Sequence, residues 1–73
     1  MTDATKKIVR VQTGVRIEKR VLKVLKAIAA RSEMGLGDLI EGIVLHSFEG
    51  KPPFGADTLD FVSQMKAAYG LDL

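Results

Sequence analysis

The chain has 73 residues, enough for one domain, and 47% of them are hydrophobic, a high share for so small a protein. It has no cysteine and one histidine, His46, which excludes disulfide bonds, thiolate metal sites and a zinc site made of histidines. The net charge is only +2, but residues 1–31 carry nine basic and two acidic residues (+7) and residues 32–73 carry two basic and seven acidic ones (−5), which predicts one surface for a polyanion.

A core this small usually needs a disulfide, a metal or a second chain, so the composition favours oligomerisation. No run of about 18 apolar residues is present. The first residues, MTDATKK, also lack the apolar block of a signal peptide. We therefore expect a cytoplasmic protein that contacts no membrane.

The N-terminal part changes character at residue 7. Residues 1–6 are polar, and we expect a flexible stretch there. Residues 7–17 alternate, with Val and Ile on one face of an extended chain and Arg10, Gln12, Gly14 and Arg16 on the other, which predicts one β-strand. The alternative is a hairpin that turns at Thr13-Gly14 within one chain, although Thr-Gly is a weak hairpin signal.

Helical spacing then replaces the alternation. Apolar residues three and four apart predict a basic amphipathic helix of about 13 residues that ends near Arg31. Gly35 and Gly37 indicate a turn. Residues 36–48 predict a second helix, which is apolar around most of its circumference and is therefore expected to meet another subunit.

The C-terminal part predicts a third helix. Gly50, followed by two prolines, ends the second helix. The third helix is expected to be capped by Asp57 or Thr58 and to end at Gly70. We expect it to pack back on the domain; the alternative is that residues 51–73 bind a protein partner.

Strand, basic helix, glycine turn and apolar helix together resemble the ribbon-helix-helix family, to which Arc, MetJ and CopG-type regulators belong. The resemblance covers about Ile8 to Phe48, and its best local matches are RIEKRVLKVLKAIA and GLGDLIEGIV. It implies a mainly α fold with one β-strand: an intertwined homodimer with an intermolecular antiparallel two-stranded ribbon, to which a C-terminal third helix is added. The domain boundaries are then 1–6 for the flexible stretch, 7–50 for DNA binding and dimerisation, and 51–73 for the extension.

The resemblance also implies a function, that of a homodimeric bacterial transcriptional repressor whose ribbon enters the major groove of double-stranded DNA. It places base contacts at Gln12, Gly14 and Arg16. Phosphate contacts are expected at Lys6, Lys7 and Arg10, and at the backbone amides of Leu36 and Gly37, where the second helix begins. The implied dimer core consists of Val11, Val15, Ile17, Leu25, Leu39, Ile40, Ile43 and Val44. Dimers could assemble further along DNA.

Three residues depart from the family pattern. Gly14 has no side chain at the central base-contacting position, and Gly35 replaces the usual hydroxyl cap. Asp38 adds a negative charge near the expected phosphate. Alternatively, Asp38 is itself the N-cap and forms a capping box with Glu41, in which case the second helix begins later.

The remaining polar residues suggest no enzyme. His46 has no partner at catalytic spacing, and no phosphate loop, zinc motif or nucleophile with a base is present, so we expect no cofactor and no metal. The alternative function is a small dimeric protein-interaction module, either antitoxin-like or an assembly protein, whose basic face is incidental.

Overall fold

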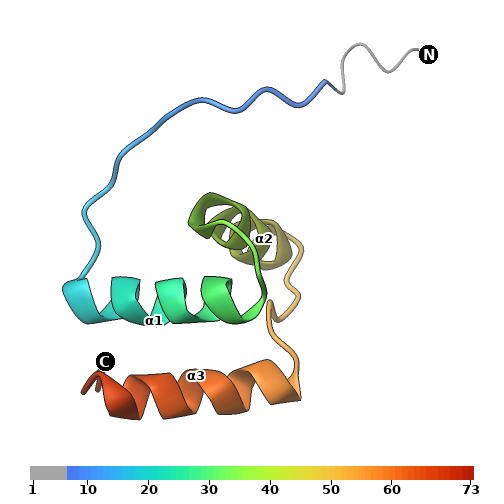
Figure 1. Cartoon of the computed structure of the whole chain (residues 1–73). Coiled ribbons are helices and arrows are strands. Elements are labelled where there is room, and N and C mark those ends of the chain that lie inside the picture. The colour runs from blue at the N-terminus through green and yellow to red at the C-terminus, as the bar shows by residue number, and fades with distance from the viewer. Residues whose placement is uncertain (1–6) are drawn as a thin grey trace.

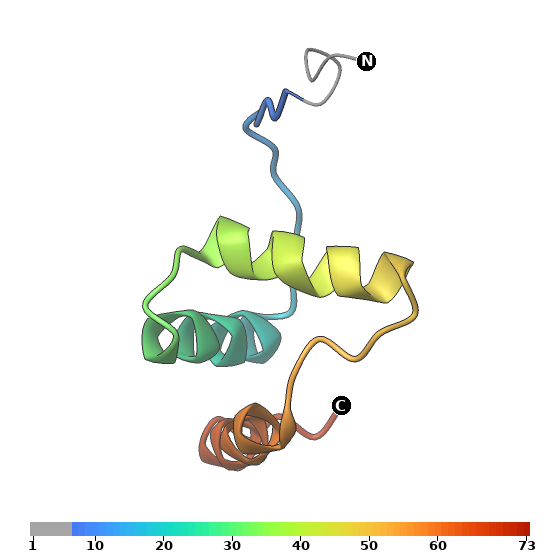
Figure 2. The same cartoon turned by 90° about the vertical axis from the view of Figure 1, so that its right-hand side faces the viewer.

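The computed structural model describes residues 7–73, and within them the chain forms three helices of 13 residues each. They are α1 (Lys19–Arg31), α2 (Leu36–Phe48) and α3 (Ala56–Ala68). α1 lies between the other two helices, with α3 antiparallel to it on one side and α2 crossing it on the other (Figure 1 and Figure 2). The three helices predicted from the sequence are confirmed.

Helix α1 begins at a side-chain cap that the sequence analysis did not identify. Glu18 Oε1 accepts hydrogen bonds from the backbone N–H groups of Arg20 (2.7 Å) and Val21 (3.0 Å), which are unpaired donors at a helix start. The bond from Val21 is the main cause that lowers the pKa of the Glu18 carboxyl. The helix ends with Arg31 in its last turn, and Glu33 then takes a left-handed φ of 54° while Met34 N–H bonds to Ala29 C=O over 3.0 Å.

Helix α2 begins at Gly35 and has no side-chain cap. The alternative start, with Asp38 as N-cap, is therefore wrong, because Asp38 already lies in the first helical turn. The helix ends as expected at Gly50, whose φ is +70°. This left-handed conformation is easy for glycine and lets Lys51 N–H bond back to His46 C=O over 2.9 Å.

Helix α3 packs back on α1, as expected. Its N-cap is Gly55 without a side-chain hydrogen bond, so the predicted caps Asp57 and Thr58 are wrong. Phe61, Val62 and Met65 pack against the buried core.

That core is small and depends on α1. The buried residues are Val24, Ile28 and Ala29 of α1 and Leu39 of α2. The chain exposes 6016 Å², whereas a compact monomer of this mass exposes about 4400 Å². Large apolar side chains are among the exposed groups, for example Val11, Leu45 and Phe48.

The predicted β-strand is absent from the described residues, which corrects the fold class. Residues 7–17, called here the extended segment, leave the start of α1 as a long trace (Figure 1) and form no strand, ribbon or hairpin. A strand requires hydrogen bonds from a neighbouring strand, and residues 7–73 supply none for this segment. The alternation of residues 7–17 therefore predicted a strand wrongly, because alternation says nothing about whether a neighbouring strand is present. The described part of the chain is all-α, which is not the ribbon-helix-helix architecture.

The three helices are also short. Within residues 7–73, none has both the length and the apolar content needed to cross a lipid bilayer.

Candidate nucleic-acid interface

The extended segment and the start of α2 enclose a groove of about 810 Å³. Gly14 and Arg16 line it from the extended segment, and Leu36 and Gly37 line it from α2. Two of the three predicted base contacts therefore lie beside both predicted phosphate-binding amides. The groove has an apolar floor that includes Ile40.

The helix start in this groove has a mixed electrostatic character. Because no side chain caps α2, its first backbone N–H groups remain available, and the helix dipole favours an anion there. Asp38 opposes such an anion: its Oδ2 lies 3.6 Å from where a Cβ on Gly35 would be, so the carboxylate turns back toward the helix start. The Asp38 carboxylate stabilises the N-terminal start of α2 but repels a phosphate there, which is the effect expected from the sequence.

Arg10 is bound to a carboxylate at the same face of α2. Its Nε donates to Glu41 Oε2 over 2.9 Å, and its Nη2 donates to Glu41 Oε1 over 3.1 Å. This pair of bonds lowers the pKa of Glu41 and raises that of Arg10. The predicted phosphate contact Arg10 is thus engaged within the chain, which the sequence analysis missed because the partner lies 31 residues away.

The other predicted contacts lie apart from the groove. Lys7 and Gln12 are exposed on the extended segment and do not line it. Lys6 lies outside the described residues.

The basic side chains of α1 divide into two groups. One group faces α3: Arg20 Nη1 donates to Gly70 C=O over 2.8 Å, Lys23 Nζ lies 5.6 Å from the Tyr69 ring centre, and the Arg31 guanidinium lies 4.8 Å from the Phe61 ring centre. The other group is Lys19 and Lys26, which form no ion pair within residues 7–73. Phe61 in α3 and Tyr69 just after it were a sequence signal for Arg31 and Lys23, because arginine and lysine stack on such rings.

The residues predicted for the dimer core have different surroundings in the single chain. Leu39 is buried, and Leu25 and Ile43 pack against the core. Ile40 is partly covered, whereas Val11, Val15, Ile17 and Val44 are exposed. On α2 four apolar residues recur every fourth position and therefore share one helix face, called here the apolar stripe: Leu36, Ile40, Val44 and Phe48.

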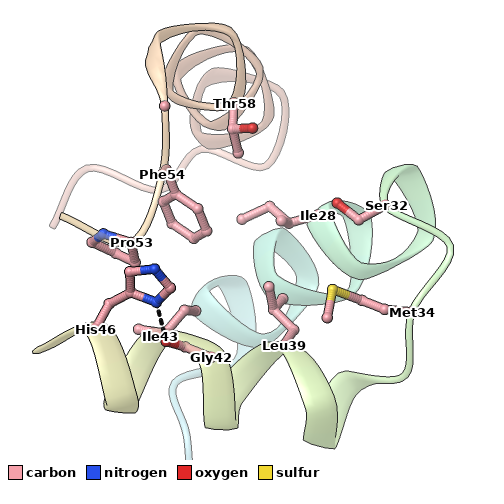
Figure 3. Close-up of a pocket in the computed structure, with 11 residues that line it drawn as sticks. Ile28, Ser32, Met34, Leu39, Gly42, Ile43, His46, Pro53, Phe54 and Thr58 are labelled. Carbon is pink, nitrogen blue, oxygen red and sulfur yellow. Dashed lines mark hydrogen bonds between the residues drawn. The ribbon is translucent and has the colours of Figure 1, made fainter. Parts of the chain in front are cut away.

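A second, smaller hollow of about 250 Å³ lies between α1, α2 and the loop that precedes α3 (Figure 3). Its lining is mostly apolar, with Ile28, Leu39 and Phe54 among the side chains that face it. His46 lies at its edge, where its Nδ1 is 2.7 Å from Gly42 C=O. No group of three metal-ligating side chains comes together in residues 7–73.

Comparison of the chain with protein-family models, with curated proteins and with solved structures finds no match.

Proposed function

We propose that this protein is a cytoplasmic DNA-binding protein that contacts duplex DNA as a homodimer and acts as a bacterial transcriptional repressor. One observation carries the proposal: Arg16 and the uncapped start of α2 line the same groove. A guanidinium can bind the edge of a guanine or a phosphate, and helix-start amides bind a phosphate. Both kinds of contact that a DNA duplex requires are therefore close together.

The distribution of cations supports a polyanionic partner. Lys7 and Arg16 on the extended segment and Lys19 and Lys26 on α1 form no ion pair within the described residues. Lysines and arginines that are not neutralised by the chain can release counterions from DNA when they bind phosphates, which is the main source of non-specific affinity.

Sequence reading is assigned to the polar face of the extended segment. Arg16 can donate two hydrogen bonds to O6 and N7 of guanine, and Gln12 can form two with adenine. Both side chains are exposed and belong to a segment that no helix covers. Gly14 between them offers only backbone, which allows a close approach to the nucleic acid.

A second copy of the chain is the proposed cover for the part of the apolar stripe that lies outside the groove, at Val44 and Phe48. Phe48 is 79% exposed and Val44 39% exposed, although both lie in a regular helix beside a packed core. An uncovered apolar face of this kind marks a protein interface. A dimer would also bring two basic segments to one DNA site, which raises the overall affinity.

The runner-up is a dimeric protein-interaction module that does not bind DNA. The exposed apolar side chains of the extended segment favour it. Val9, Val11 and Val15 are 73–80% exposed, and exposed apolar surface of this kind is typical of protein-binding sites. In that case the cations would be incidental.

Titration of a fluorescent duplex at several salt concentrations separates the two candidates. We expect log K to fall linearly with log salt, with a slope of about −0.9 for each phosphate contacted. Replacing Lys19 with Gln should weaken binding and flatten the slope, whereas Lys51→Gln, which removes the same charge from the acidic half of the chain, should change little. A protein that stays dimeric but ignores DNA at low salt would instead be the interaction module.

A further inference from the structure

One cation of the extended segment is already bound to an anion within the chain. Arg10 and Glu41 form two parallel hydrogen bonds, of 2.9 Å and 3.1 Å, in the fork arrangement typical of a guanidinium and a carboxylate. Two oxygens of a tetrahedral phosphate can accept the same pair of hydrogen bonds from a guanidinium. Glu41 therefore occupies the edge of Arg10 that a DNA phosphate would take.

This pair is also the tether of the extended segment. No other side-chain hydrogen bond or ion pair links residues 7–17 to the rest of the described chain. Glu41 itself lines the groove beside Arg16 and Gly37, so its charge lies where a phosphate would enter. The side chains of Arg10 and Glu41 are 60% and 47% exposed, so water and salt reach the pair and it can open.

We propose that Glu41 is an internal competitor for DNA phosphates: it holds Arg10, ties the extended segment to α2 and lowers the affinity for DNA. The proposal rests on the proposed function. The pair suppresses binding because Arg10 cannot give the same edge to Glu41 and to a phosphate. Glu41 thus makes non-specific binding weaker than the cation content alone would give.

The test compares Glu41→Gln with Glu49→Gln in the full chain. Both variants remove one negative charge from α2 or its end, and both break an exposed ion pair, because Glu49 Oε1 lies 3.0 Å from Lys51 Nζ. We expect Glu41→Gln to bind a random-sequence duplex about two- to fivefold more tightly than Glu49→Gln, the range of an exposed pair. The salt slope should steepen by about 0.9, because Arg10 gains a phosphate. Equal affinities and slopes in the two variants would overturn the competition.

A double-mutant cycle tests whether Glu41 acts through Arg10. Arg10→Gln should weaken DNA binding more in the Glu41→Gln background than in the native chain, because only there is Arg10 released for phosphate. A general effect of charge would make the two losses equal and would contradict the proposal. Amide relaxation measured by NMR for residues 8–12 gives a readout without DNA: Glu41→Gln should make them more mobile, and unchanged relaxation would show that no tether exists.

The outcomes separate the two proposals. If the native chain binds duplex in a salt-dependent way and Glu41→Gln binds no better than its control, the competition is wrong and the function stands. If Glu41→Gln alone binds duplex, the competition is stronger than we expect and both proposals are supported. If none of the chains binds duplex at low salt, the DNA-binding function fails, and the competition fails with it.

Discussion

Apolar side chains form a buried core in the helical body, residues 19–73, but are exposed in the extended segment, residues 7–17. Val24 in α1 is 5% exposed, whereas Val11 in the extended segment is 80% exposed. A helix satisfies its own backbone hydrogen bonds and needs only one covered face to be stable. An extended chain satisfies neither its backbone nor its apolar side chains without a neighbour.

This difference assigns stability to one region and binding to the other. The body holds all the buried residues of the described chain. Helix α3 and the residues just after it add contacts to α1 through Arg20, Lys23 and Arg31. The extended segment has one polar tether, at Arg10, and carries the exposed Arg16 and Gln12. Substitutions in the body should therefore alter folding, and those in the segment should alter recognition.

The largest expected effect is on the body. Ile28→Ala removes a side chain that is 3% exposed and should destabilise the fold by about 2–5 kcal/mol, from lost burial and the cavity left behind. Val11→Ala, in the extended segment, should change stability by less than about 0.5 kcal/mol at concentrations where the chain is monomeric. Urea unfolding followed by circular dichroism measures both. Similar losses at the two positions would mean that the segment belongs to the folded core.

The next effect concerns the apolar stripe. Val44→Asp should weaken self-association at least about 100-fold, because an unpaired charge at an apolar contact costs several kcal/mol. Leu59→Asp is the matched control: Leu59 is an exposed leucine on α3, outside the stripe, and its replacement should leave the dimer intact. Analytical ultracentrifugation distinguishes the two. A dimer that survives Val44→Asp would exclude the stripe as the interface.

Arg16 should affect recognition without affecting the body. Arg16→Ala should weaken binding to a selected duplex by about 1–3 kcal/mol and relax the preference at one base pair, with an unchanged melting temperature. Selection from a random duplex pool, followed by affinity measurements on single-base variants, tests both parts. A loss that is uniform across sequences would make Arg16 a phosphate contact.

A smaller effect is expected at the turn between α1 and α2. Glu33 has φ 54°, a conformation that costs a residue with a Cβ roughly 1–2 kcal/mol and costs glycine little. Glu33→Gly should therefore stabilise the body by about 1 kcal/mol. Glu33→Ala removes the same charge but keeps the strain, so it should not stabilise. Thermal unfolding measures the stability of both variants. An equal gain in stability in the two would show that the lost charge, and not the relieved backbone strain, causes the effect.

The smallest effect is the response to acid, and it differs between the two regions. Glu18 and Glu41 both have a pKa below the ordinary carboxyl value. The stabilisation that each ionised carboxylate gives is therefore fully present above the ordinary pKa, and it is lost as the pH falls through the lowered pKa. Protonation of Glu18 should loosen the start of α1, and protonation of Glu41 should release the extended segment without loss of helix. NMR titration of the two carboxyl groups, with backbone relaxation, follows each event; Glu18→Gln should abolish only the first.

The candidate site was predictable only in part. The resemblance to the ribbon-helix-helix family implied contacts at Gly14, Arg16 and Leu36, and these three residues line one groove in the structure. The Glu41 bond to Arg10 and the contacts of α3 with the cations of α1 did not follow, because each joins residues far apart in the chain.

The sequence by itself determined the three helices and their C-terminal ends, since helical periodicity and terminal glycines act within one or two turns of the chain. It did not determine the caps at the helix starts or the structure of residues 7–17. Only the tertiary structure decided that this segment has no neighbouring strand in the described chain, that α1 lies between α2 and α3, and that Arg10 meets a carboxylate. The physical reason is that a helix closes its hydrogen bonds locally, whereas an extended chain and an ion pair depend on partners that the order of residues does not specify.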